Sequence, residues 1–189
     1  DYQPYMAVRK LSTLDHLTKG RIGWNIVTST NVAEAVNLGL EKMIPHTERY
    51  ERADEYMEVC HKLWNSWEPD AVVTDKKTGV FIDASKVHPI NHKGKWFSCP
   101  GISAVEPSPQ GHPVLFQAGA SDAGRDFCAK HAEALFGVQL TTRALKSFAD
   151  DMRQRLKKMG RDSSSVKYIW GIQTVLGGTE AEEKRRHQE

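Results

Sequence analysis

Two polar side chains that could bind an anion stand at the start of a long amphipathic segment. His46 and Tyr50 are four residues apart in IPHTERYERADEY (44–56), so a helix would project them from one side of its first turns. A helix N-terminus carries unpaired N–H groups and partial positive charge, and both suit a phosphate. The imidazole and the phenol hydroxyl would add two donors. The alternative, which this segment taken alone favours, is a core tyrosine beside a solvated histidine.

A second candidate is the glycine-rich run QAGASDAG (117–124), which follows a buried-type strand. Ser121 is placed to cap the next helix, while Gly119 and Gly124 leave room for the close backbone approach that an anion needs. A capped helix after a tight turn would explain the same residues. A serine-hydrolase elbow, G-x-S-x-G, fails at Ala123, and no acid or histidine partner can be assigned to it.

The third candidate is WNIVTS (24–29), where Asn25, Thr28 and Ser29 follow a predicted strand. Parallel α/β sheets bind ligands at the carboxyl edge of their strands, so these side chains would lie at a binding edge. The alternative is a strand that ends in an ordinary polar turn.

Other classes of site are disfavoured. His88 and His92 flank Pro89 and turn residues, and no Cys or carboxylate cluster accompanies them, so we expect no metal. The 26 Lys and Arg nearly balance 24 Asp and Glu, which gives none of the basic field of nucleic-acid binders. No apolar run approaches the roughly 20 residues that span a bilayer, so we expect no membrane partner. Three widely spaced cysteines favour a reducing, cytoplasmic setting.

The elements that must position these residues alternate along the chain. Apolar spacing predicts a helix over 5–18, a strand over 21–30, a short helix over 32–40 and a long helix from Thr47 to Trp67. Further strands are predicted over 113–119, 134–140 and 166–177, and helices over 121–132, 142–158 (capped by Thr142) and 179–189. This order calls for a parallel sheet covered by helices in one domain, 1–189. Residues 70–113 are rich in turns and read as an insertion that contains a hairpin.

With these segments in view, the sequence resembles a known family. The resemblance runs in collinear order through nearly the whole chain. It is carried by LDHLTKGRIGWNIVTS (14–29), IPHTERYERADEYMEVCHKLWNSWE (44–68), HKGKWFSCPG (92–101), SPQGHPVLFQAGASDAGRDFCAKHAEALF (108–136) and VLGGTEAEE (175–183). These blocks look like the flavin-dependent monooxygenases of the nitrilotriacetate and dibenzothiophene-sulfone type, a branch of the bacterial luciferase-like superfamily.

The resemblance implies a (β/α)8 barrel with FMN at its C-terminal mouth and a two-component mechanism. A separate NAD(P)H-dependent reductase would supply reduced FMN by diffusion. The reduced flavin would react with O2 to give a C4a-hydroperoxide that oxygenates a small organic substrate. The hard chemistry then belongs to the cofactor, which explains why no acid/base dyad stands out.

Residue by residue, His46 and Tyr50 match the family's H-x-x-x-Y flavin contact, and Ser121 matches the serine at the FMN phosphate, with Gly119 in the same block. Asn25 and Ser29 match the strand end beside the flavin, where Ser29 could steady the peroxide or the substrate. These assignments rest on the resemblance.

The resemblance also sets expectations about size. A complete barrel takes roughly 250 residues, and about four core strands are visible here. We therefore expect the central portion of a barrel, truncated at both ends, whose open sheet edges favour a homo-oligomer. Two alternatives stay open: a catalytically inactive flavin-binding or oligomeric fragment, and a luciferase-like enzyme that uses a deazaflavin.

Overall fold

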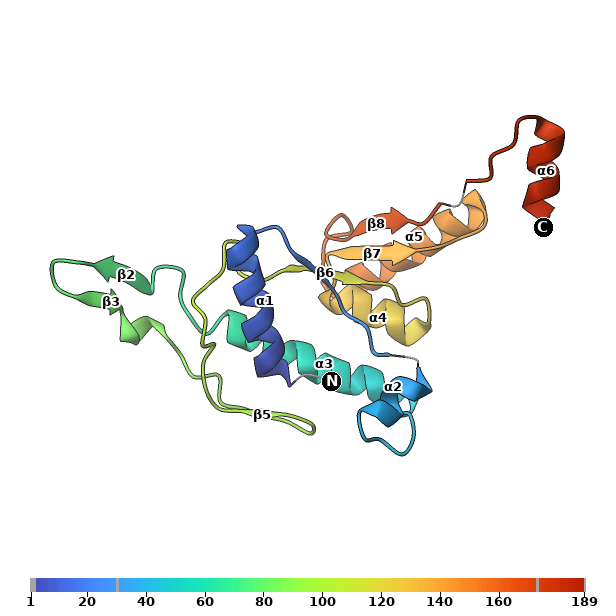
Figure 1. The fold of residues 1–189 in the computed structure, drawn as a ribbon. Coiled ribbons are helices and arrows are strands. Elements are labelled where there is room, and N and C mark those ends of the chain that lie inside the picture. Colours follow the sequence, from blue (N-terminus) through green and yellow to red (C-terminus); the bar gives the residue numbers. More distant parts are fainter. Residues whose placement is uncertain (1–2, 30, 173, 189) are drawn as a thin grey trace.

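Four parallel strands and the helices between them form the body of the computed structural model, which describes residues 3–29, 31–172 and 174–188. The sheet has the order β1-β6-β7-β8, with every neighbouring pair parallel. Its strands and helices have these bounds: α1 Pro4–Thr18, β1 Gly23–Asn25, α2 Val32–Asn37, α3 His46–Trp64, β6 Val114–Gln117, α4 Asp122–His131, β7 Ala134–Gly137, α5 Thr142–Lys158, β8 Lys167–Trp170 and α6 Glu180–Gln188. Figure 1 shows α6 lying away from this body.

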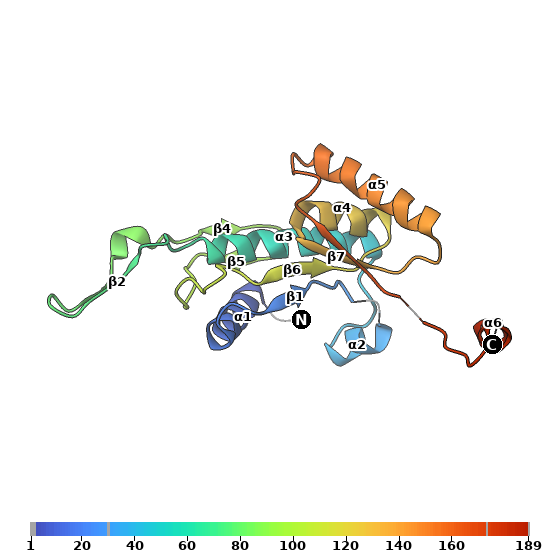
Figure 2. The same ribbon diagram turned by 90° about the horizontal axis from the view of Figure 1, so that it is seen from above.

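The two faces of the sheet have different surroundings. Register places Trp24, Leu115, Leu135 and Tyr168 on one face, and Figure 2 shows α3, α4 and α5 on one side of β6 and β7. Leu115 and Leu135 are almost fully buried there. The opposite face carries Asn25, Phe136 and Ile169, and the two apolar side chains remain 44% and 43% exposed. Helices therefore cover one face of the sheet, and the other is open.

Two apolar clusters hold the helices on the covered face. The first joins α1, β1, α3, β6 and α4 through Val8, Ile26, Met57, Leu115 and Phe127. The second joins α4, β7 and α5 and includes Leu135, Met152 and Leu156, all buried. Amphipathic periodicity predicts helices that bury one stripe, and α3 buries Met57, Cys60, Leu63 and Trp64 in this way.

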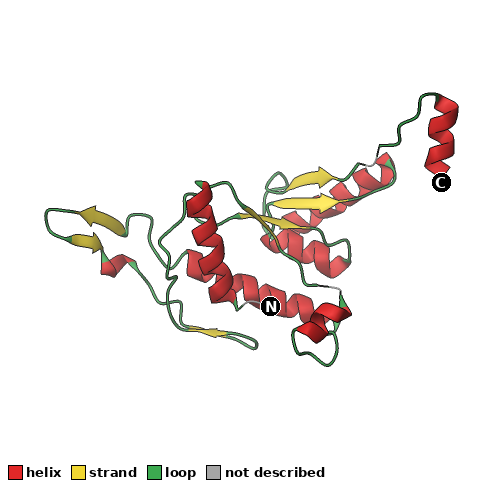
Figure 3. Cartoon of the chain, in the orientation of Figure 1, coloured by secondary structure: helices red, strands yellow, loops and turns green. Residues whose placement is uncertain are grey.

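Residues 70–113 lie outside the sheet and have little regular structure (Figure 3). They hold an antiparallel hairpin of β2 (Val72–Asp75) and β3 (Val80–Ile82), the short 3-10 helix η1 (Ala84–Lys86), and a second hairpin of β4 (His92–Lys93) and β5 (Ser98–Cys99). The β2–β3 hairpin projects away from the body in both ribbon views (Figures 1 and 2). That this segment is an insertion stays a prediction.

Several predicted boundaries were wrong. The strand expected over 21–30 is only Gly23–Asn25, and Ser29, four residues beyond its end, takes a positive φ of 53°, which is not extended backbone. The strand expected over 166–177 ends at Trp170. The long helix stops at Trp64, and Trp67 instead bridges to Val87.

The cap of α5 also differs from the prediction. Thr141, not Thr142, is the N-cap: its backbone is extended and its side chain accepts a hydrogen bond from the Ala144 N–H at 3.2 Å. Two adjacent threonines could each cap, and the sequence does not distinguish them. Among the described residues, no helix combines the length and apolar character needed to cross a membrane.

A buried carboxylate fastens the second hairpin to α3. Glu55 accepts hydrogen bonds from the backbone N–H groups of Lys95, Trp96 and Phe97, and lies 3.2 Å from Nε2 of His92. Its side chain is only 11% exposed. Burial alone would raise the pKa of Glu55, but the hydrogen bonds from Phe97, His92, Trp96 and Lys95 outweigh it and hold that pKa below its usual value.

We predict that Glu55→Ala lowers the free energy of unfolding by about 2–3 kcal/mol, because backbone donors lose a charged acceptor. Glu51→Ala is the control: Glu51 lies one turn earlier on α3 and is 54% exposed, so its loss should cost less than about 0.5 kcal/mol. Urea denaturation measures both.

The same comparison has a pH dependence of known sign. A carboxyl whose pKa is depressed on folding stabilises the protein above its unfolded pKa of about 4.3 and loses that effect as the pH falls through its folded pKa. The gap between wild type and Glu55→Ala should therefore be full at pH 7 and narrow below about pH 4. A gap that is absent at pH 7, or that widens in acid, would contradict this role of Glu55.

Candidate functional site

Helices α3 and α4 pack side by side with their N-termini at the same end. Three contacts along their length fix this arrangement. Oγ of Ser121, the N-cap of α4, lies 3.4 Å from Nε2 of His46 at the start of α3. The ring of Tyr50 meets that of Phe127 at a centroid distance of 5.7 Å. Farther along, Nε2 of His131 lies 2.7 Å from Oδ1 of Asp54. Two helix N-termini, each with partial positive charge, therefore converge.

Each donor at this convergence is held by local structure. Ser121 has extended backbone, and its Oγ accepts a hydrogen bond from the Gly124 N–H at 3.1 Å, as an N-cap does. His46 opens α3 directly after Pro45, and its ring contacts that of Tyr50 at 5.0 Å. His46 and Ser121 are exposed, while Tyr50 is half-buried. Two hydroxyls and an imidazole thus gather on α3 and α4.

Two glycines make this approach possible. A Cβ on Gly124 would lie 2.8 Å from the Tyr50 hydroxyl oxygen and 2.9 Å from Cα of Gly119. A Cβ on Gly119 would lie 2.8 Å from Cα of Gly124 and 2.6 Å from Nε2 of Gln117. Real Cβ atoms do not approach other atoms this closely. The backbone of the loop after β6 therefore touches that of α4 with no space for a methyl group on either residue.

Charges around the start of α4 are balanced by arginines of α4 and α5. Arg155 donates to Oδ1 of Asp122 at 2.6 Å, to Oδ1 of Asp126 at 2.7 Å and to Oδ2 of Asp151 at 2.9 Å. Arg125 donates to the same Asp151 and to the Ala120 carbonyl. Burial alone would raise the pKa of Asp151, but these two guanidinium groups hold it below its usual value. The pairing offsets the negative charge that Asp122 brings to the helix start.

The strand end that carries Ser29 reaches the same helix through Arg49. Nη1 of Arg49 donates to the Ser29 carbonyl at 2.7 Å, and the Ser29 hydroxyl hydrogen-bonds to the Glu34 carboxylate. Arg49 directly precedes Tyr50 on α3. Asn25 is exposed on the open face of the sheet, next to Phe116 of β6 by strand register. Ser29 thus lies beside the first turn of α3, and neither Ser29 nor Asn25 shares a hydrogen bond or ring contact with His46, Tyr50 or Ser121 in the described structure.

Of the predicted residues, the structure brings together His46, Tyr50, Ser121 and Gly119 and keeps Ser29 and Asn25 apart from them. Sequence reasoning missed Arg49 and Gln117. The Gln117 side chain is buried, and its Oε1 accepts from the Gly119 N–H. Both residues lie within the segments that carry the other candidates, so their spacing was the available signal. In the part of the chain that the structure describes, no group of three His, Cys, Asp or Glu side chains could hold a metal.

Comparison with known proteins shows which family this chain matches. The family model described as luciferase-like monooxygenase matches residues 2–189. The chain is 52% identical over 180 residues to the long-chain alkane monooxygenase of Geobacillus thermodenitrificans, which covers 95% of this chain and 41% of the relative. It is 41% identical over 186 residues to nitrilotriacetate monooxygenase component A of Aminobacter aminovorans, which covers 98% of this chain and 41% of the relative. The resemblance drawn from the sequence is confirmed.

Solved structures agree with the fold. The crystal structure of riboflavin lyase with modified FMN and its substrate riboflavin has a TM-score of 0.90 to this chain at 40% identity, and covers 99% of this chain and 42% of the lyase. The predicted α/β fold is confirmed, with luciferase-like TIM-barrel monooxygenases as structural neighbours. The chain spans about two fifths of the length of the curated relatives it matches.

The glycine contact yields a prediction. We expect Gly124→Ala to lower the free energy of unfolding by about 1–3 kcal/mol, because the methyl group must displace the Tyr50 hydroxyl or the backbone at Gly119. The steric cost of the methyl group should exceed the roughly 1 kcal/mol by which alanine favours a helix over glycine, so the variant is less stable overall. Gly101→Ala is the control, because nothing lies within 4 Å of its added Cβ. Equal unfolding midpoints for the two variants would contradict the close contact.

Proposed function

This chain belongs to the luciferase-like monooxygenase family, and from that premise we propose that it binds the phosphate of FMN where α3 and α4 begin. The observation that carries the proposal is the convergence of His46, Tyr50 and Ser121 at two helix N-termini. Helix N-termini with hydroxyl and imidazole donors are suited to a phosphate dianion.

The donor set fits the chemistry of a phosphate. Ser121 and His46 lie 3.4 Å apart, so one phosphate group could accept from both. No hydrogen bond of the Tyr50 hydroxyl is found among the described residues, so this donor remains available. The nearest first-turn acid of α4, Asp122, is paired with Arg155. The site is therefore rich in donors, and its acid is already balanced by a cation.

The residues at the strand end are proposed to meet the flavin ring. Asn25 lies on the open sheet face, and an amide there could hydrogen-bond a ring edge. Ser29 is held by Arg49 and Glu34 in a left-handed conformation, so its orientation is fixed. We assign Ser29 the role of steadying the substrate or the reacting oxygen. Reduced FMN, when bound, supplies the oxygen-activating chemistry, and the chain holds and orients it.

The wider activity proposed is that of a two-component monooxygenase acting on a small organic substrate with O2. A separate NAD(P)H-dependent reductase would supply the reduced FMN. The name of the nitrilotriacetate relative, component A, supports this arrangement. Cys60, Cys99 and Cys128 are free thiols, which suits a reducing, cytoplasmic setting. We also propose that this chain forms a homo-oligomer.

The phosphate assignment is tested by titrating this chain with FMN and with riboflavin, which lacks the phosphate. We expect FMN to bind at least about tenfold more tightly, since hydrogen bonds to a charged group contribute roughly 1.5–3 kcal/mol each. Tyr50→Phe removes one donor but keeps the ring packed on Phe127, and should weaken FMN by about tenfold without affecting riboflavin. Flavin fluorescence quenching reports both affinities.

Tyr168→Phe is the matched control, because its hydroxyl is buried on β8 without a partner among the described residues. Its affinity for FMN should equal that of the wild type. Equal binding of FMN and riboflavin, or no effect of either Tyr50→Phe or Ser121→Ala, would refute the phosphate site. The same titration with reduced FMN under anaerobic conditions tests the redox form that the proposed reaction uses.

A further inference from the structure

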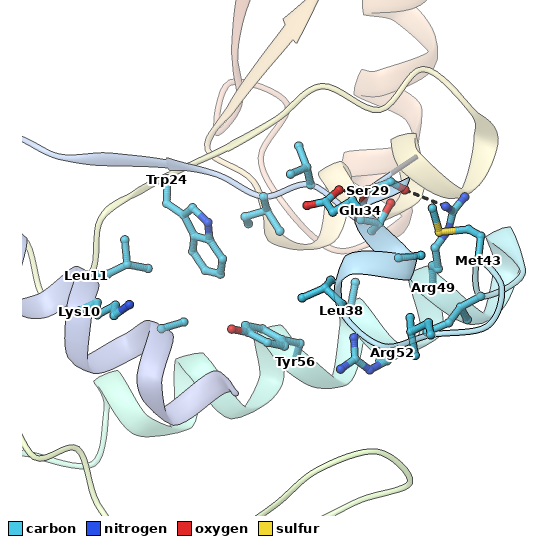
Figure 4. A pocket seen from close by; sticks show the side chains of 18 of the residues that line it. Lys10, Leu11, Trp24, Ser29, Glu34, Leu38, Met43, Arg49, Arg52 and Tyr56 are labelled. Carbon is cyan, nitrogen blue, oxygen red and sulfur yellow. Dashed lines mark hydrogen bonds between the residues drawn. The ribbon is translucent and has the colours of Figure 1, made fainter. Parts of the chain in front are cut away.

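A cavity of about 530 Å³ lies beside β1 on the side that Trp24 and Ile26 face, between α1, α2 and α3 (Figure 4). Most of its walls are apolar, formed by these side chains: Leu11, Leu14, Trp24, Ile26, Leu38 and Met43. Small-molecule sites typically have volumes of about 300–1,000 Å³, largely apolar walls and a few placed polar groups. The cavity has these properties.

This cavity is separate from the proposed phosphate donors of the flavin site. Its lining includes Trp24 and Ile26, which face the helices, and not Asn25, which lies on the open face of the sheet. His46, Tyr50 and Ser121 do not line it either. Ser29 lines the cavity and is the point of contact between the two regions. The cavity therefore offers space that FMN phosphate binding does not use.

One face of α3 gives the cavity its polar end. Arg49, Arg52, Ala53 and Tyr56 follow the i, i+3, i+4, i+7 spacing of a single helix face, and all four line the cavity. Figure 4 shows Arg49 and Arg52 near the α2 segment. Lys10 adds a third cation at the opposite end. The charged lining is thus three cations and one carboxylate, Glu34.

Arg49 is the cation with hydrogen-bonding capacity to spare. A guanidinium has five N–H donors, and within the described ranges the acceptor found for Arg49 is the neutral Ser29 carbonyl. Its Nε is buried without a partner in the same ranges. The Glu34 carboxylate hydrogen-bonds to Ser29, and no ion pair with Arg49 is found between described residues. Arginine pairs carboxylates and similar anions with two hydrogen bonds.

We propose that this cavity binds a small amphiphilic anion, with its acid group at Arg49 and its hydrocarbon part against Trp24, Leu11 and Leu38. The apolar walls remove the hydrocarbon from water, and the arginine selects the anionic head group. The site does not depend on the flavin assignment, since none of the three phosphate donors contributes to it.

The test compares three ligands that share a ten-carbon chain, with the two ionic ligands below their micelle concentrations and the alcohol below its solubility limit. We expect decanoate to bind this chain at least about tenfold more tightly than decan-1-ol or decyltrimethylammonium, because one charge-assisted pair with arginine contributes about 1.5–3 kcal/mol. Isothermal titration calorimetry gives the affinities. Arg49→Gln should abolish the preference for decanoate, and Arg49→Lys should retain part of it.

Two further variants distinguish binding in the cavity from binding elsewhere on the surface. Leu38→Asp places a negative charge in the apolar wall at a half-exposed position and should weaken the binding of decanoate and decan-1-ol. Arg143→Gln removes an exposed arginine on α5 outside the cavity and should change nothing. Circular dichroism checks that each variant folds.

Three results would overturn the proposal. Equal affinity for all three decyl compounds would indicate a nonselective apolar surface. An undiminished preference in Arg49→Gln would remove the arginine from the site. Displacement of FMN by decanoate would make the two sites one. If FMN does not bind but decanoate still binds selectively, the flavin assignment is refuted and the cavity site is supported.

Discussion

The contact between Gly119 and Gly124 is the constraint on which the candidate site depends. Because neither residue has a Cβ, the loop after β6 lies directly on the first turn of α4, and the Tyr50 hydroxyl of α3 lies on the same spot. Ser121 then reaches His46, and two helix N-termini face one place. A methyl group on either glycine would push these elements apart. Backbone packing therefore fixes the positions of the proposed phosphate donors.

The sequence predicts this part of the molecule well, because its signals are local. Ser121 as a cap depends on one side chain and the three residues after it, and the cap is present. The parallel sheet follows from the alternation of strands and helices. The end of β1 is predicted poorly, and the residues beyond it include Ser29, which has a positive φ and contacts Arg49 and Glu34. Arg49 lies twenty residues away in the sequence, so no local pattern predicts that contact.

Adjacent residues in and directly after β1 face two different environments. Asn25 faces the open side of the sheet, whereas Trp24 and Ile26 face the helices and the cavity. Ser29 comes after the strand ends and touches both α2, through Glu34, and α3, through Arg49. A ligand that takes the remaining N–H groups of Arg49 would lie beside the Ser29 carbonyl, which already accepts from Nη1. Ser29 is thus the residue through which occupancy of the cavity could alter the strand end beside the proposed flavin ring.

The open face of the sheet affects how much the flavin ring and the phosphate should each contribute to the affinity of this chain for FMN. Parallel sheets are normally covered on both faces, yet Phe136 and Ile169 keep more than two fifths of their surface exposed here. A flavin ring lying on that face would be covered by this chain on one side, so its apolar contribution is limited to one set of contacts. The proposed phosphate donors, in contrast, all come from α3 and from the start of α4, and His46 contacts the other two. In this chain the phosphate should therefore contribute most of the affinity, and the ring contacts should add less than they would in a site enclosed on both sides.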